Sequence, residues 1–158
     1  QGAMNMSNTA QDKITIKTRD FGEQEISKAD IIDFPNGIFG FEDSKRFVVL
    51  SPLGDEASPM WLQSVDSTVP CFIVFKPLDF ITDYAPEPAL DDLSLIKLED
   101  KEDIEVLSIA VIPEDYKKTT LNIKSPIIVN KKDRIAVQTI LDEDYDIKFP
   151  LYQSIKEE

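Results

Sequence analysis

The stretch FPNGIFGFEDSKRFVVL, residues 34–50, joins an aromatic turn to a run of strand-forming residues. Asn36-Gly37 is a dipeptide typical of tight chain reversals, in which the glycine adopts a positive φ angle. Gly40 provides a second position without a side chain, where another backbone or a partner can approach closely. The run RFVVL has the branched and aromatic side chains of a buried strand. The stretch therefore predicts a glycine turn that leads into a β-strand.

The apolar side chains of this turn cannot all point into a core, because the turn is too short. Phe41 and Phe47 are expected to close one end of the core, and Ile38 can also serve it. Phe39 is then left exposed, and an exposed aromatic ring is a good anchor for a partner protein. Most of the turn is thus predicted to have a structural role. Ile38, Phe39 and Phe41 are the candidate partner-binding residues.

The rest of the chain has many short segments that are apolar at alternate positions or throughout, as in strands. They are KITIKT, ADIIDF, RFVVL, MWLQSV, CFIVFK, IEVLSIAVI, PIIVN and RIAVQTIL, with a turn around Gly22 between the first two. Leu90, Leu93 and Ile96 are spaced by threes, which predicts a short helix, and PEDYKKT predicts a single further turn. The predicted fold class is all-β, a small β-barrel-like single domain of mainly antiparallel strands with one or two short helices.

The length of 158 residues fits one domain. Residues 1–12 are interpreted as a tag remnant followed by a flexible N-terminus, and residues 153–158 as a C-terminal tail that is helical or disordered. The barrel-like domain is then expected to span residues 13–152. A single cysteine, Cys71, allows no intramolecular disulfide, and no apolar run is long enough to span a bilayer. These features predict a cytoplasmic protein without membrane contact.

The formal net charge is −13, which is the wrong sign for a protein that binds nucleic acid directly. Two interpretations of this acidity stay open, namely solubility and attraction to a basic protein partner. The acidic stretch from Asp79 to Glu105 is the expected face for such a partner. The candidate residues on it are Asp79, Asp83, Tyr84, Asp91 and Asp92.

Enzyme motifs are scarce in this sequence. It has no histidine, so the commonest general base and the imidazole metal ligands are absent. The carboxylates of residues 99–105 lack the glycine and the register of an EF-hand, so no metal site and no cofactor is predicted. Cys71 and Trp61 are expected to be buried core residues. A carboxylate-dependent hydrolase stays as the weaker alternative, since the chain has 30 Asp and Glu residues.

Two blocks carry a specific resemblance to a known family. They are F-x-x-G-I-x-G-F-E at Phe34–Glu42 and LNIKSPIIVN at Leu121–Asn130, with RFVVL, MWLQSV, FIVFKPLDFITDY and RIAVQTIL in matching order. From about Ile14 to Tyr152 the chain resembles the flagellar assembly factor FliW. Phe39 stands where the family usually has proline, and Ala136 stands where glycine is common.

Structural roles are expected for several residues of the matching blocks. Pro126 is predicted to mark the start of a strand at a sheet edge, and Asn122 and Asn130 to cap the turns that flank it. The structural motif residues are Gly37, Gly40, Asn122, Pro126, Asn130 and Gln138.

The resemblance implies a non-enzymatic protein with two protein partners. It implies that the protein binds flagellin in the cytoplasm and, when free, binds and antagonises CsrA, a basic RNA-binding dimer, which relieves repression of flagellin translation. A monomer is expected when no partner is bound. A flagellin-holding chaperone without a regulatory partner is the alternative within the same family.

Overall fold

The computed structural model describes residues 12–54 and 57–152, and its centre is a closed barrel. Neighbouring strands pair in the order β7-β6-β5-β4-β3-β10-β9, and β9 pairs with β7 to close the ring. All these pairs are antiparallel except β3 with β10. The strands are β3 (Ile32–Asp33), β4 (Arg46–Leu50), β5 (Met60–Ser64), β6 (Cys71–Phe75), β7 (Ile104–Val111), β9 (Ile127–Asn130) and β10 (Ile135–Gln138). The all-β, barrel-like prediction is confirmed.

Closure of the barrel corrects one expectation about Pro126. The proline does precede a strand, but β9 is not an edge strand, because β10 flanks it on one side and the first half of β7 on the other. A closed barrel removes the edge at which a proline would ordinarily be tolerated. Pro126 avoids the conflict by lying one residue before the ladder begins.

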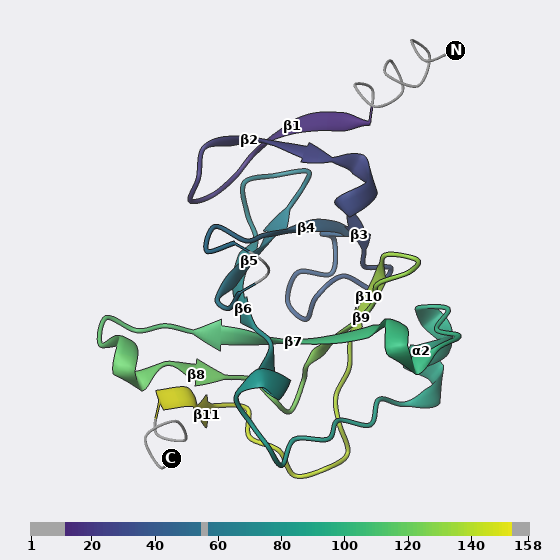
Figure 1. The fold of residues 1–158 in the computed structure, drawn as a ribbon, viewed down its shortest axis with the longest axis vertical. Helices are drawn as coiled ribbons and strands as arrows, with labels where there is room; N and C mark the ends of the chain where they lie inside the picture. The colour runs from purple at the N-terminus through teal and green to yellow at the C-terminus, as the bar shows by residue number, and fades with distance from the viewer. Residues whose placement is uncertain (1–11, 55–56, 153–158) are drawn as a thin grey trace.

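Strand β7 is shared between the barrel and a smaller sheet. Residues 104–107 pair with β9, whereas Ala110 and Val111 pair with β8 (Thr120–Leu121). β11 (Phe149–Pro150) adds to the far side of β8. Figure 1 shows β7 crossing the middle of the molecule with β8 and β11 below it. The one long strand therefore joins the two parts of the fold.

A hairpin of β1 (Lys13–Lys17) and β2 (Glu23–Ser27) lies against the outer face of β4, at the top of Figure 1. Its buried residues Ile16 and Ile26 pack with Val48 and Val65. The turn at Gly22 was predicted, but β2 was not, and ADIIDF supplies only the two-residue β3. The segment EQEIS has a single apolar residue, so pairing with β1, rather than hydrophobic pattern, makes it a strand.

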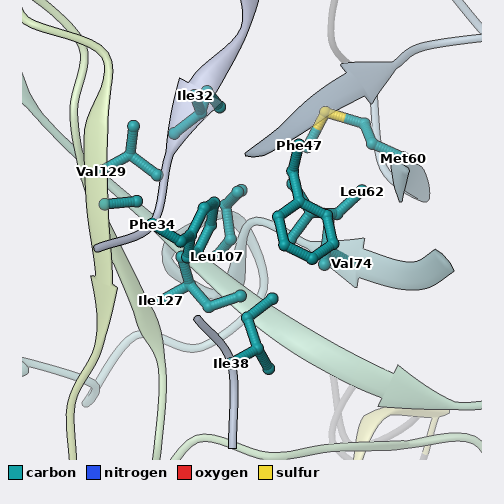
Figure 2. Packing of buried hydrophobic residues seen from close by; sticks show 11 residues of the cluster. Ile32, Phe34, Ile38, Phe47, Met60, Leu62, Val74, Leu107, Ile127 and Val129 are labelled. Carbon is teal, nitrogen blue, oxygen red and sulfur yellow. The ribbon is translucent and has the colours of Figure 1, made fainter. Parts of the chain in front are cut away.

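The barrel interior is filled by one apolar cluster, shown in Figure 2. Phe34 and Phe47 are fully buried at its centre, with ring centroids 5.0 Å apart and the rings edge to face. Cys71 is buried as predicted. Trp61 is not a core residue: it is half-buried on the outside, where its indole N–H donates to Asp20 over 2.9 Å. A polar partner at the surface suits the one hydrogen-bond donor of this ring.

A second apolar cluster lies outside the barrel, under the helix α2 (Leu90–Leu95), the smaller sheet and the long loops. The predicted helix is present, and Ile96 at its end is buried, but Leu90 is 80 % exposed. The remaining elements are the 3-10 helices η1 (Lys28–Asp30), η2 (Pro77–Asp79), η3 (Lys101–Asp103) and η4 (Tyr116–Lys118), of which η4 is the single turn expected in PEDYKKT.

The expectations for the two ends of the chain concern residues that lie almost entirely outside the described ones. The tag remnant and the flexible N-terminus fall mostly on residues 1–11, and the tail on residues 153–158. In the part of the chain that the structure describes, no helix has the length and apolar character needed to cross a membrane.

Candidate partner-binding site

The glycine turn begins with a tight reversal at Gly37. The Gly37 N–H donates to the Phe34 carbonyl over 2.9 Å, and Gly37 has a φ of 67°. A Cβ atom added to this glycine would lie 2.6 Å from the Glu42 Cα. The close backbone approach expected at Gly40 is therefore found at Gly37, because a Cβ on Gly40 would meet nothing within 4 Å.

The tip of the turn is a second reversal, in which Phe39 and Gly40 lie between Ile38 and Phe41. The Phe41 N–H donates to the Ile38 carbonyl over 2.6 Å, and Gly40 has a φ of 85°. The Gly40 N–H also donates to the Glu42 carboxylate over 3.0 Å. This backbone donor lowers the pKa of Glu42. The tip is thus held by its own hydrogen bonds in a conformation that needs glycine at position 40.

The turn presents two aromatic rings to solvent. Phe39 is 49 % exposed, which confirms the prediction, and Phe41 is 46 % exposed. Phe41 was expected to close the core, but its ring instead lies edge-on against Phe72 of β6, with centroids 5.4 Å apart. Ile38 was a candidate contact and is only 1 % exposed, so it belongs to the barrel core. Phe39 and Phe41 are therefore the solvent-exposed aromatic side chains of this turn, named here the aromatic tip.

Gln138 ties the aromatic tip to the rest of the barrel. Its side-chain carbonyl accepts from the Phe39 N–H over 2.9 Å, and its amide donates to the Ser125 carbonyl over 3.1 Å. Gln138 is buried at the end of β10. One side chain thus joins the two blocks that carry the family resemblance, although they are far apart in the sequence.

We expect Gln138→Leu to lower the free energy of unfolding by about 1–3 kcal/mol, because it leaves the Phe39 N–H and the Ser125 carbonyl without partners. Urea unfolding followed by tryptophan fluorescence measures this loss. Gln24→Leu is the control, since the Gln24 amide donates to a single carbonyl in the exposed hairpin. A loss no larger than that of the control would contradict the role of Gln138 as a tie.

The predicted capping roles of two asparagines are confirmed. The Asn122 side-chain oxygen accepts from the Ser125 N–H over 3.0 Å. The Asn130 oxygen accepts from the N–H groups of Lys132 and Asp133, while its amide donates to the Ile96 carbonyl over 2.8 Å. Asn130 therefore fixes both the turn after β9 and the end of the acidic helix α2 against the barrel.

The acidic candidates divide into exposed and structural residues. Asp79, Asp83 and Asp91 are exposed. Tyr84 is buried and its hydroxyl donates to the Ile123 carbonyl over 2.7 Å, so it is not the surface contact that was expected. Asp92 is half-buried and accepts from the Thr139 hydroxyl over 2.6 Å, which anchors α2 to the barrel. The structure does not gather these residues at the aromatic tip.

A cavity of about 430 Å³ lies beside two of these residues, Asp83 and Tyr84. Its other walls include Asp144, Tyr145 and Asp146, which sequence analysis missed. The only signal for them was the acidic run DEDYD at residues 142–146, which lies far along the chain from Asp83.

Comparison with known proteins identifies the family. The family model described as FliW protein matches residues 15–151. The chain belongs to the FliW family. It is 43% identical over 134 residues to the flagellar assembly factor FliW of Bacillus velezensis, covering 84% of this chain and 93% of that protein. It is 39% identical over 135 residues to the FliW of Natranaerobius thermophilus, covering 84% of this chain and 88% of that protein.

A solved structure supports the same assignment. The crystal structure of a flagellar assembly factor FliW superposes with a TM-score of 0.81 at 28% sequence identity, covering 88% of this chain and 97% of that one. The protein is thus a flagellar assembly factor. FliW proteins form a non-enzymatic family, so the hydrolase alternative is set aside.

Two further observations concern the chemistry of the described side chains. Among residues 12–54 and 57–152, no group of three or more Cys, Asp or Glu side chains is arranged to hold a metal ion. Burial raises the pKa of the Cys71 thiol, which makes it a poor nucleophile at neutral pH. The surface of this FliW carries exposed aromatic rings and carboxylates.

Proposed function

We propose that this protein binds flagellin in the cytoplasm and, when flagellin does not occupy it, binds the basic RNA-binding dimer CsrA. Binding would antagonise CsrA and so relieve repression of flagellin translation. The observation that carries this proposal is the aromatic tip, with two half-exposed rings on a turn fixed by Gln138. On this proposal the protein is a monomer when unbound and contacts neither RNA nor membrane directly.

The aromatic tip has the properties of a preorganised contact. The Phe39 backbone is hydrogen-bonded to a buried side chain, and the Phe41 ring is supported by Phe72. Binding a partner there orders few new degrees of freedom, so a larger share of the contact energy appears as affinity. Aromatic side chains are also frequent among the residues that dominate interface energies.

The charge of the protein favours a basic partner. With a net charge of −13, the chain attracts a cationic protein over a distance comparable to the Debye length, which is about 8 Å at physiological salt. The same charge repels RNA. A protein of this kind can therefore approach the RNA-binding protein without binding the RNA.

Titration of this protein into a purified CsrA–RNA complex tests the proposal, with RNA release followed by fluorescence anisotropy. Release of RNA, and its reversal when purified flagellin is added, is the expected result. Flagellin binding without any effect on the CsrA–RNA complex would instead favour a flagellin-holding chaperone with no regulatory partner. Absence of binding to both proteins would overturn the proposal.

Replacing Phe39 with alanine should leave the fold intact and weaken binding. Truncation of a surface side chain usually changes the free energy of unfolding by no more than about 0.5 kcal/mol. Loss of an anchor ring should cost more than about 1 kcal/mol of binding to flagellin or CsrA. Urea melts beside calorimetric titrations measure the two quantities, and Leu53→Ala is a matched control at another exposed apolar side chain. Unchanged affinity for both partners would show that Phe39 is no anchor.

Binding to CsrA should weaken as salt is raised, because ions screen the long-range attraction. Calorimetry at about 50 and 500 mM NaCl should show at least a several-fold loss of affinity. Asp91→Lys should weaken binding with little change in melting temperature, since Asp91 is exposed. Asp92→Lys is the contrasting variant, because it also removes the hydrogen bond to Thr139. An affinity that does not depend on salt would mean that charge does not drive the association.

A further inference from the structure

Four of the ten residues that line the cavity of about 430 Å³ are aromatic. Phe80, Tyr84, Tyr145 and Phe149 line it, and the rings of the two tyrosines meet edge to face with centroids 4.8 Å apart. The Tyr84 hydroxyl donates to the Ile123 carbonyl, and the Tyr145 hydroxyl oxygen accepts from the Ala85 N–H over 3.2 Å. These hydrogen bonds fix both rings, so the cavity is preformed.

Three aspartates belong to the same cavity. Asp83, Asp144 and Asp146 line it and are exposed to solvent. Among the ion pairs that the described residues form, none involves these three carboxylates. Their charge is therefore available to a ligand, and an anion would be repelled.

Glu143, the residue before Asp144 in the chain, adds a carboxylate close enough to act on Tyr84. One of its carboxylate oxygens is buried without a hydrogen-bond partner among the described residues. Burial first, and then the neighbouring Tyr145 and Glu143, raise the pKa of Tyr84, so this ring stays neutral at physiological pH. The cavity combines neutral π faces with exposed carboxylates that form no ion pair among the described residues, which is an environment that suits a cation. The nearby Lys124 ammonium donates to the Glu143 backbone carbonyl over 2.7 Å and not to these carboxylates.

We propose that this cavity binds an arginine side chain from a basic segment of a partner protein. A guanidinium is planar, stacks on aromatic faces and pairs with carboxylates, and it loses less hydration than an ammonium on entering such a site. The apolar stem of the side chain would lie along Ile81, which also lines the cavity. The site shares no residue with the aromatic tip, so it is a second recognition surface and does not depend on which partner supplies the arginine.

The test uses the full chain and two synthetic peptides, tetra-arginine and its uncharged analogue tetra-citrulline, in calorimetric titrations. The pocket variant carries Asp83→Asn, Asp144→Asn and Asp146→Asn. The control variant carries Glu23→Gln, Glu102→Gln and Glu114→Gln, which makes the same change in net charge at exposed positions outside the cavity. Thermal melts of each variant confirm that the fold is retained before binding is compared.

We expect tetra-arginine to bind the unaltered protein, and its affinity to fall about tenfold in the pocket variant but less than about threefold in the control. Tetra-citrulline should not bind detectably. A further variant, Tyr145→Leu, should weaken tetra-arginine binding several-fold by removing one π face while leaving every carboxylate in place. Equal losses in the pocket and control variants, or full binding by Tyr145→Leu, would overturn the proposal in favour of unspecific attraction.

This outcome is separable from that of the proposed function. Tetra-arginine binding to the cavity supports the inference whether or not the protein releases RNA from CsrA. Failure of tetra-arginine to bind overturns the inference. The proposed function would be unaffected, because it rests on the aromatic tip and on the net charge.

Discussion

Replacing Phe47 with alanine should lower the free energy of unfolding by about 3–5 kcal/mol, the usual cost of removing a fully buried aromatic ring. Phe47 has no solvent exposure and lies in the middle of the barrel cluster of Figure 2. Its ring contacts that of Phe34 edge to face, so truncation also removes an aromatic pair. The closed ring of strands limits how far the walls can relax into the space. Equilibrium urea unfolding, followed by far-ultraviolet circular dichroism, measures the effect.

Phe41→Ala is the matched control for this experiment. Phe41 has the same side chain, but it is 46 % exposed and its ring contact is with Phe72, a partly buried ring that packs against the cluster. We expect a loss of about 1 kcal/mol, mainly from that ring contact. Equal losses for the two variants would mean that Phe41 helps to close the core, as the sequence alone had suggested.

Replacing Gly37 with alanine should destabilise the protein by about 2–5 kcal/mol. The left-handed backbone at this position costs about 1–2 kcal/mol for a residue with a side chain. The added methyl group would also press on the Glu42 backbone at 2.6 Å, which is overpacking that costs about 1–3 kcal/mol. The turn must shift to make room, and Phe39 would shift with it. Urea melts measure the loss of stability. On the proposed function, displacement of the Phe39 ring should also weaken binding in titrations with flagellin or CsrA.

Gly40→Ala separates the two contributions. Gly40 also has a positive φ angle, of 85°, but a Cβ there would meet no atom within 4 Å. This variant should therefore show only the backbone cost of about 1–2 kcal/mol. If the Gly37 variant were as stable as the Gly40 variant, the backbone near Glu42 would have to move aside at little cost in free energy.

The fold class was predictable because most strands are short runs of branched and aromatic residues, which favour β structure. RFVVL, MWLQS and CFIVF became β4, β5 and β6 with little change of bounds. The strand EQEIS was missed because it contains a single apolar residue and therefore shows no alternation of apolar and polar positions. The sequence predicted a barrel-like fold but not that β7 and β9 close it, since this contact depends on how the whole sheet curls. For the same reason Pro126 was placed at an edge that does not exist.

The site was predictable only where local backbone geometry governed it. The exposure of Phe39 followed from two glycines and a short turn. The hydrogen bonds of Gln138 could not be predicted, because only the folded barrel brings Phe39 and Ser125 next to it. The aromatic cavity joins loops near Asp83 and Asp144, and no periodicity links residues so far apart in the sequence. Tyr84 was wrongly expected at the surface, because the sequence shows that a side chain is polar but not which buried hydrogen bond it makes.

The parallel contact between β3 and β10 has a consequence for how the protein is made. It pairs Asp33 with Ile135, so the barrel cannot close during synthesis until most of the chain has been translated. Gln138, which fixes the Phe39 backbone, is translated in the same late strand. A nascent chain that ends before β10 therefore lacks the hydrogen bond that holds the Phe39 backbone, and the aromatic tip is completed only late in synthesis.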